Sequence, residues 1–166
     1  MKKNKIFHIF ILFIFTGSTS RSQTVDLSPD TLRFELAKGK KDGKVVCTKE
    51  IVTAGQPAKI QLLADRKAIE ADEQDVVHIE VNIQDKENNF VPDASNRIHF
   101  KVEGEAKIIA VDNGDPLNDE SYDYPSRKAF NGKCLIILKS TGKVGQFKVI
   151  AEADGLESAD VTVNTK

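Results

Sequence analysis

The sequence has no tryptophan, one methionine and only two cysteines among its 166 residues. A hydrophobic core must therefore rely on aliphatic side chains and on phenylalanine. Two cysteines are too few for the disulfide framework of a small secreted scaffold. Cys47 and Cys134 lie 87 positions apart, and sequence alone does not show whether they form a bridge or stay as two separate buried thiols.

Helical patterns and clusters of one charge are also scarce. After residue 22, no stretch repeats apolar residues at three- and four-residue spacing over three turns. Lys and Arg total 24, Asp and Glu total 25, and the formal charge is −1. Without a basic cluster, the sequence argues against a nucleic acid or an anionic membrane surface as a partner.

The first 22 residues are expected to form a secretory signal peptide. The basic start MKKNK precedes the apolar run IFHIFILFIFTG, and small residues follow at Ser20 and Ser22. The apolar run is short for a membrane span, so we expect cleavage after Ser22 and no membrane contact afterwards, with an uncleaved anchor as the alternative. The mature chain would be secreted or periplasmic. It would begin at Gln23 and, with four positive charges removed, carry a formal charge of −5.

Alternation of apolar and polar residues dominates the rest of the chain. It is clear in DVVHIEVNIQD, NRIHFKVEG, GQFKVIAEADG and ESADVTVNT, while KCLIILKS is nearly continuous and predicts a strand buried on both faces. Turn-forming residues separate these segments at 85–89, 102–106, 140–145 and 153–158. The pattern predicts an all-β protein, an immunoglobulin-like (adhesin-like) antiparallel β-sandwich over 55–166 with seven or eight strands. The side chains expected to face inward are Val77, Ile79, Val81, Ile83, Phe100, Val102, Leu135, Ile137, Phe147 and Val149.

The segment 23–54 is predicted to be a separate β-hairpin, the remnant of a preceding immunoglobulin-like domain. TLRFELA and KVVCTKEIVT alternate as strands do, and KGKKDG joins them. AGQPAK then forms a short linker that Pro57 stiffens. A lone hairpin is marginally stable in water, so its apolar side chains need a partner.

Four stretches of the chain resemble one protein family. They are VTAGQPAKIQLLADR, VNIQDKENNFVPDASNRIHFKVEGEAKIIAVDNGDP, ESYDYPSRKAFNGKCLIILKSTGKVGQFKVIAEADGL and SADVTV. They resemble the C-terminal immunoglobulin-like domain of glycoside hydrolase family 2 enzymes, above all the β-galactosidase-like members of Bacteroidota. The resemblance covers Ala54 to Thr165, and VDNGDP, ES and RKAFNG are its most specific parts. In that family another immunoglobulin-like domain precedes this one, and its last hairpin is similar to residues 32–53.

The resemblance implies a non-catalytic accessory or structural domain, present as a fragment or as a stand-alone secreted module. The family's (β/α)₈ barrel, which carries two catalytic glutamates, needs roughly 250 residues and has no counterpart in this sequence. We therefore expect no enzyme activity, no catalytic, cofactor-binding or metal-binding residue, and no cofactor. The implied partners are other domains of such an enzyme. The alternative function is a secreted carbohydrate- or cell-surface-binding β-sandwich module.

The loop DNGDPLNDESYDYPSRKAFNG, residues 112–132, is the strongest candidate site. Two of its acids could form a glycosidase pair, which requires a sugar-binding cleft. Four of them could bind Ca²⁺, although their spacing matches no EF-hand. The favoured interpretation is structural: the acids bond local backbone amides, and Arg127 or Lys128 pairs with one of them. Docking onto a neighbouring domain is a further alternative. The acids of the loop are Asp112, Asp115, Asp119, Glu120 and Asp123, of which all but Glu120 are the candidate Ca²⁺ ligands.

The remaining candidate side chains are two tyrosines, two histidines and two serines. Tyr122 and Tyr124 lie two residues apart and could stack on a sugar, or simply shield the end of the sandwich. The histidines have no third ligand nearby in sequence and are expected on the solvent side of their strands. The serines lie near acids but in no nucleophile-elbow pattern. These residues are His78, His99, Ser121 and Ser126.

Overall fold

The computed structural model of the protein describes residues 27–28, 31–41 and 44–166. Every regular element in these ranges is a β-strand, which confirms the predicted all-β class. No helix suited in length and apolar character to crossing a membrane occurs in the described part. The predicted signal peptide, residues 1–22, lies outside the described residues.

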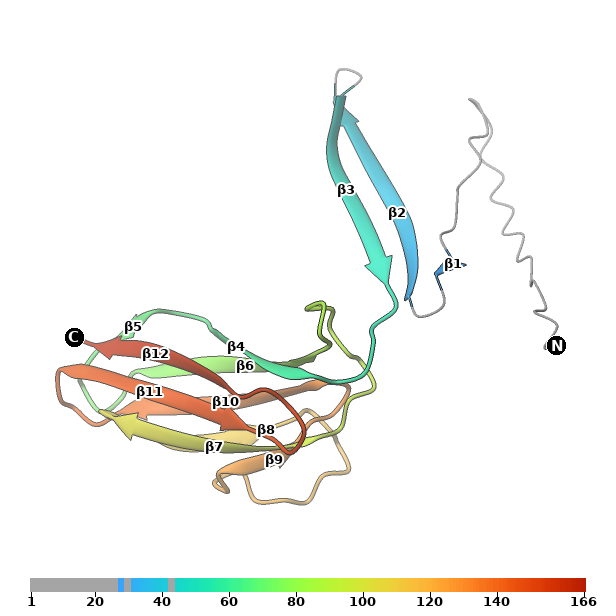
Figure 1. The fold of residues 1–166 in the computed structure, drawn as a ribbon. Coiled ribbons are helices and arrows are strands. Elements are labelled where there is room, and N and C mark those ends of the chain that lie inside the picture. The colour runs from blue at the N-terminus through green and yellow to red at the C-terminus, as the bar shows by residue number, and fades with distance from the viewer. Residues whose placement is uncertain (1–26, 29–30, 42–43) are drawn as a thin grey trace.

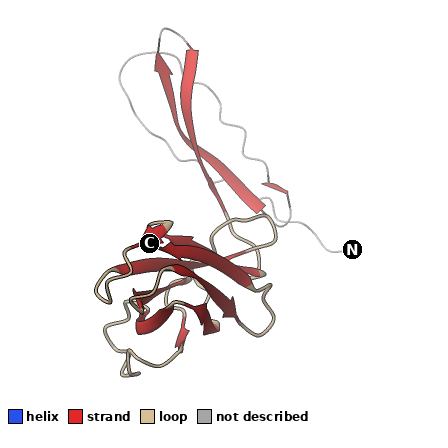
Figure 2. Ribbon diagram, turned by 90° about the vertical axis from the view of Figure 1, so that its left-hand side faces the viewer, coloured by secondary structure: helices blue, strands red, loops and turns tan. Residues whose placement is uncertain are grey.

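Two sheets packed face to face form the predicted sandwich (Figures 1 and 2). One sheet has four antiparallel strands in the order β4-β6-β10-β8, and the other has five in the order β5-β12-β11-β7-β9. The four-stranded sheet comprises β4 (Lys59–Ala64), β6 (Val76–Gln84), β8 (Ala106–Asp112) and β10 (Lys133–Ser140). The five-stranded sheet comprises β5 (Ala68–Ile69), β7 (Arg97–Gly104), β9 (Ser126–Lys128), β11 (Gly145–Glu152) and β12 (Ala159–Thr165).

The sandwich therefore has nine strands where seven or eight were predicted. The difference lies in β5 and β9, which are two and three residues long. Such short segments carry too few residues for an alternating pattern. β5 is also the exception to antiparallel pairing, since it runs parallel to β12.

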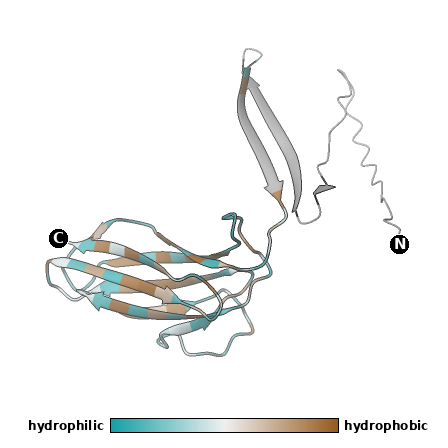
Figure 3. Ribbon diagram, in the orientation of Figure 1, coloured by the Kyte–Doolittle hydropathy of each residue, from teal (hydrophilic) through white to brown (hydrophobic). Residues whose placement is uncertain are grey.

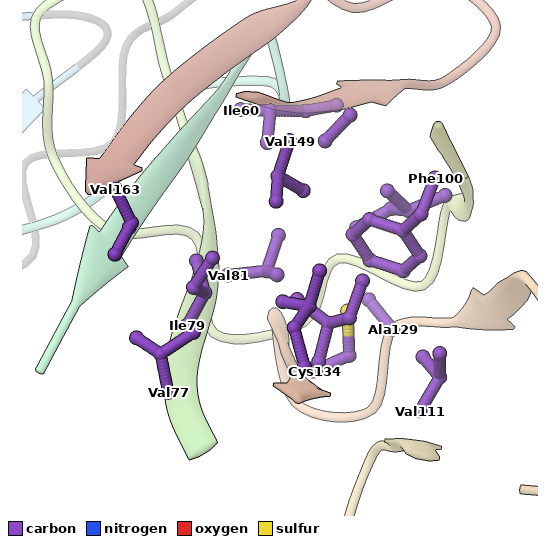
Figure 4. Close-up of a cluster of buried hydrophobic side chains, with 14 of the residues drawn as sticks. Ile60, Val77, Ile79, Val81, Phe100, Val111, Ala129, Cys134, Val149 and Val163 are labelled. Atoms are coloured by element: carbon purple, nitrogen blue, oxygen red, sulfur yellow. The ribbon is translucent and has the colours of Figure 1, made fainter. Parts of the chain in front are cut away.

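The core lies between the sheets and consists of the side chains that alternation placed on the inner faces (Figure 4). On β6 the inward residues Val77, Ile79, Val81 and Ile83 are each 0% exposed, as predicted. Figure 3 shows the corresponding bands of apolar and polar residues along the strands. Phe100, Phe147 and Val149 of the facing sheet are also buried, and Val102 is half-buried against the core.

The predicted register of β10 is wrong by one residue. Cys134, Ile136 and Leu138 face the core, and Ile136 lies opposite Ile79 of β6. Leu135 and Ile137 are half-buried on the outer face, so the strand is not buried on both sides either. The physical reason is that KCLIILKS has apolar residues at consecutive positions, which leaves period two undefined.

A three-stranded sheet precedes the sandwich and projects from one of its ends (Figure 1). It consists of β1 (Leu27–Ser28), β2 (Thr31–Lys41) and β3 (Lys44–Val52). β2 extends through Lys41 into the predicted KGKKDG loop, whereas β3 begins at Lys44 as predicted, so only Asp42-Gly43 lies between them. Asp-Gly favours a two-residue hairpin connection, and the prediction of a six-residue loop did not take this signal into account. The domain boundaries proposed from the sequence stay a prediction.

Two glycines permit close approaches near the ends of the strands. Gly104 ends β7 with φ of +105°, and a Cβ there would lie 2.3 Å from the carbonyl oxygen of Gln146. Gly132 has φ of +75°, and a Cβ there would lie 2.2 Å from the carbonyl oxygen of Val91. A side chain at either position would collide with backbone, so both turns require glycine.

Candidate functional site

The acidic loop joins β8 to β9 and uses its acids and amides to hold its own backbone. The carboxylate of Asp112 accepts from the amides of Asn113 at 2.8 Å and Gly114 at 3.3 Å. The side chains of Asn113 and Asp115 each accept at 3.0 Å from the amide two residues later. Asn118 Oδ1 does the same for the amide of Glu120 at 2.8 Å. The loop is thus a chain of side-chain-to-backbone turns, which is the structural arrangement that the sequence favoured.

The side chain of Arg127, at the middle of β9, holds this loop in place. Its side chain is 1% exposed, and its guanidinium donates to the carbonyl oxygens of Val111 at 2.5 Å, Ser121 at 2.7 Å and Glu120 at 3.0 Å. A weaker bond of 3.4 Å reaches Asn118 Oδ1. The planar fork of an arginine can serve several acceptors at once, which a lysine cannot. One buried cation therefore ties the end of β8 to the loop that follows it.

The prediction that Arg127 or Lys128 pairs with an acid needs correction for Arg127. Arg127 contacts carbonyl and amide oxygens, whereas the loop acid Glu120 pairs with Arg97 of β7. That pair is bidentate, with N–O distances of 2.7 and 2.9 Å. The hydrogen bond from Arg97 holds the pKa of Glu120 below its usual range and raises the pKa of Arg97, although burial opposes both shifts. The alternation of β7 pointed Arg97 outward, but only the fold brings it to Glu120.

The loop also forms one wall of an open hollow of about 370 Å³. Residues 93–95 form a second wall and residues 128–131 a third. The lining is polar except for Ala94, Ala129 and Phe130, and the ring-bearing residue Phe130 is 37% exposed. Gly132 bonds the carbonyl of Ala94 through its amide at 2.9 Å and so holds two of these walls together. The hollow is large enough for one small polar ligand.

The acids of the loop do not converge as metal ligands in the described part of the chain, where no group of three or more His, Cys, Asp or Glu side chains is placed to hold an ion. Asp112 and Asp115 direct oxygens to backbone amides, and Asp123 accepts from the hydroxyl of Ser121. The carboxylate of Glu120 faces Arg97. Four of the five acids therefore have local structural partners.

The two tyrosines lie in the loop between β8 and β9. Tyr122 and Tyr124 are 61% and 58% exposed. The ring of Tyr122 covers the Arg127 guanidinium at 5.7 Å, and its carbonyl accepts from the amide of Val111 at 2.6 Å. Tyr122 thus shields the buried arginine while much of its ring stays open to solvent.

The two histidines lie on different sheets, and Ser126 of β9 is the cross-strand partner of His99 on β7. His78 and His99 stand on the outer faces of different sheets, as the alternation predicted. His78 Nδ1 lies 3.5 Å from a carboxylate oxygen of Asp65. Ser126 is 1% exposed beside Arg97, a burial that sequence reasoning missed. Its position at the start of a three-residue strand gave no pattern from which to find it.

Cys134 is a free thiol buried on the inner face of β10. Burial raises its pKa to about 12, against the opposing influence of the nearby Arg127 charge. A thiol with such a pKa stays protonated and is a poor nucleophile. Cys134 is therefore a core residue, and the side chain of Cys47 lies outside the described part of the structure.

Comparison with known proteins decides the family. Residues 60–162 match the family model described as glycoside hydrolase family 2 C-terminal domain 5. The chain belongs to this family of C-terminal domains. It is 41% identical over 127 residues to beta-galactosidase BoGH2A of Bacteroides ovatus, an alignment that spans 76% of this chain and 15% of that protein.

Solved structures of glycosidases contain the same fold. A beta-glycosidase from Bacteroides vulgatus superposes with a TM-score of 0.74 at 30% identity, over 82% of this chain and 17% of that one. A glycosyl hydrolase family 2 member from Bacteroides cellulosilyticus gives 0.72 at 31% identity, over 84% of this chain and 18% of its own. Both superpositions cover more of this chain than residues 55–166 alone contain, so the structural likeness extends into the segment before residue 55. The chain spans less than a fifth of the length of the relatives it matches.

Proposed function

We propose that this chain is a non-catalytic accessory domain of a β-galactosidase-like family 2 glycoside hydrolase, present as a fragment or as a stand-alone secreted module. The observation that carries the proposal is the family match, which places residues 60–162 in a C-terminal domain and not in a catalytic one. The acidic loop supports it, because most of its carboxylates are engaged in holding the backbone or in an ion pair.

The outer face of the four-stranded sheet supports a role in packing against another domain. Leu63 and Ile109 are 48% and 40% exposed there, and Leu135 and Ile137 of β10 are half-buried between them. Glu80 is the cross-strand neighbour of both Leu63 and Leu135. Its carboxylate oxygen Oε1 forms an ion pair with Lys133 Nζ at 2.6 Å. An outer face with this many aliphatic side chains resembles a surface that is covered in a larger protein.

The outer face of the five-stranded sheet is different in character. Lys101 and Glu103 form an ion pair on β7, and Lys148 pairs with Asp160 across β11 and β12. Ile150 is the one large aliphatic side chain in the middle of these strands that faces the same way. Because the charges of this face already satisfy one another, we propose that it faces solvent and that the aliphatic face contacts the neighbouring enzyme domain.

A chimera tests the docking role. Residues 58–165 replace the segment that they match in BoGH2A, and activity and melting temperature are measured. The double change L63K and I109K should lower the melting temperature of the chimera but not that of the isolated chain. The matched control, T162K with N164K on the outer face of the other sheet, should change neither. Equal effects of the two double variants on the chimera would count against the aliphatic face as the contact.

An activity assay tests the non-catalytic part. Purified 23–166 is incubated with a chromogenic galactoside, and we expect no turnover above a heat-treated sample. Turnover that disappears on changing Asp115, Asp119 or Glu120 would overturn the proposal, because it would place a carboxylate pair in the acidic loop.

Carbohydrate or cell-surface binding is the second candidate function. The observation that favours it is the hollow beside the acidic loop, with Phe130 on its wall and two exposed tyrosines on the loop. Sugars stack on exposed rings and hydrogen-bond to amides and carboxylates. Affinity electrophoresis in gels that contain a β-galactan or a β-glucan would detect such binding, and F130A or Y122A should abolish it. Unretarded migration of the unchanged chain in every gel would exclude binding to these polysaccharides.

We also propose that the chain is exported through its N-terminal segment and cleaved after Ser22. The basic start followed by a short apolar run supports this proposal. Mass spectrometry of protein recovered from the periplasm or the medium should give a chain that begins at Gln23. A product that retains Met1 and sediments with membranes would contradict it.

A further inference from the structure

Asp85 is a buried carboxylate whose charge is held by four N–H donors. Its side chain is 2% exposed, and it forms no ion pair within the described part of the chain. Oδ1 accepts from the amides of Glu87 at 3.0 Å and Asn89 at 2.8 Å. Oδ2 accepts from Asn89 Nδ2 at 3.0 Å and from the amide of Gly55 at 2.8 Å. Both oxygens are therefore fully used, and all four donors are uncharged.

Three of these four bonds fix the acid within its own turn. The backbone amide of Asp85 also donates to the carbonyl of Asn89 at 2.9 Å, which closes the turn that follows β6. Asn88 has φ of +69°, a left-handed conformation that asparagine tolerates in such turns. The turn therefore positions the carboxylate independently of its contact with the linker.

The fourth bond leaves the turn and reaches the linker between β3 and β4. Gly55 lies three residues after Val52, the end of β3, and four before Lys59, the start of β4. Its amide is 30 residues away from Asp85 in sequence. The amide of Ala58 donates to the carbonyl of Gln84 at 2.8 Å, so two adjacent residues at the end of β6 hold two points of the linker. Figure 1 shows that the chain turns sharply here between the projecting sheet and the sandwich.

Ionisation makes this contact strong. Burial by itself would raise the pKa of Asp85, but the bonds from Gly55, Asn89 and Glu87 outweigh it and hold the pKa below its usual range. Hydrogen bonds to a charged acceptor are shorter and stronger than neutral ones. An apolar contact between the linker and the sandwich would have no preferred direction. A hydrogen bond from an amide to a fixed carboxylate does have one.

We propose that Asp85 is the joint residue that sets the direction in which the preceding β-module leaves the sandwich. The carboxylate fixes Gly55, and Gly55 in turn fixes the path of the chain into β3. Asp85 has this role whether the chain acts as an enzyme accessory or as a binding module.

Residual dipolar couplings of backbone amides in the mature chain, 23–166, test the joint. In the unchanged protein, one alignment tensor should fit the amides of β3 near the linker together with those of the sandwich. In D85N the sandwich couplings should keep their fit, and the β3 couplings should no longer follow the same tensor. The Gly55 amide should also exchange with solvent roughly tenfold faster or more, because it loses its acceptor.

A matched control and a second variant keep the outcome decisive. D93N makes the same chemical change on an exposed acid of the same loop, and it should keep the common tensor and leave the exchange rate of the Gly55 amide unchanged. If D85N does not fold, G55P removes the amide donor and leaves Asp85 its other three bonds, with the same loss of a common tensor expected. Separate tensors in the unchanged protein, or a common tensor retained when the bond is removed, would overturn the proposal.

Discussion

At the residue scale, Arg127 and Asp85 are buried charges of opposite sign, and uncharged hydrogen-bonding groups hold both of them. Each is almost fully buried, and each is held by backbone groups and amides, with no opposite charge in contact among the residues that the structure describes. A buried charge is tolerated only when hydrogen bonds replace the water that it loses. Asp85 reaches a linker amide 30 positions away, and Arg127 ties the end of β8 to the loop that follows it.

Replacing Arg127 with methionine should destabilise the protein strongly. R127M leaves the carbonyl oxygens of Val111, Glu120 and Ser121 without their donor, and each acceptor left buried costs about 1–3 kcal/mol. Urea unfolding of the mature chain measures the loss. The control R97M breaks an exposed ion pair and should cost only about 0–1 kcal/mol. Similar losses for the two variants would mean that Arg127 does not organise the loop.

Glu120 should titrate below its ordinary range because of Arg97. The pKa of Glu120 is lowered chiefly by the hydrogen bond from that side chain. In R97Q the pKa should rise towards the value of a free glutamate, whereas R66Q, which changes an exposed arginine elsewhere, should leave it unchanged. The pair contributes stability above the ordinary glutamate pKa, and this is lost as pH falls through the depressed one. NMR of the side-chain carboxyl carbon against pH measures the shift.

At the element scale, β10 decides how the four-stranded sheet meets the core. It lies in the centre of that sheet between β6 and β8, and a bulge at Ile137–Leu138 shifts its register with β8. The bulge leaves Ile109 as an extra residue on the outer face of β8, where it is 40% exposed. The aliphatic outer face thus depends on the register of one strand and on one irregularity.

Alanine substitutions on neighbouring positions of β10 should separate its two faces. I136A removes a side chain that is 0% exposed and should cost about 2–5 kcal/mol of unfolding free energy. I137A removes a half-buried outer side chain and should cost about 1 kcal/mol. Thermal or urea unfolding gives both values. A larger loss for I137A than for I136A would support the register that was predicted from the sequence, with Ile137 facing the core.

At the scale of the whole molecule, the projecting sheet β1–β3 and the sandwich differ in how they are supported. The sandwich buries two inner faces against each other, whereas β2 and β3 pair chiefly with one another and with a two-residue β1. A sheet of this size has little apolar surface of its own to bury. Asp85 anchors the linker between the two parts, so the direction of the projecting sheet and its internal stability are separate properties.

Hydrogen exchange should reveal that difference in stability. Amides of 45–52 in β3 are expected to exchange much faster than those of 77–83 in β6, because β3 is the edge strand of a three-stranded sheet while β6 is an inner strand of the sandwich. The measurement is made on monomeric mature protein at several concentrations. Equal protection of the two segments in the monomer would show that the hairpin belongs to the main fold, and the predicted boundary near Gly55 would be wrong.

The sequence by itself determined the fold class and most of the core. Alternation in β6, β7 and β11 placed Ile79, Phe100 and Phe147 inward, because period two leaves one face to bury. The same local rules identified the acidic loop as a set of turns, since Asp and Asn side chains bond amides one or two residues away. The family resemblance over Ala54 to Thr165 also came from the sequence, and residues 60–162 match the family model.

Only the tertiary structure decided the register of β10, the partners of Arg127 and Glu120, and the contact between Asp85 and Gly55. A continuous apolar run has no preferred face until neighbouring strands impose one, which is why Ile136 and not Ile137 faces the core. Arg127 finds its carbonyls, and Asp85 finds Gly55 thirty positions away, because strand pairing brings those segments together. Contacts of that kind depend on the path of the whole chain, and no local pattern of residue types encodes them.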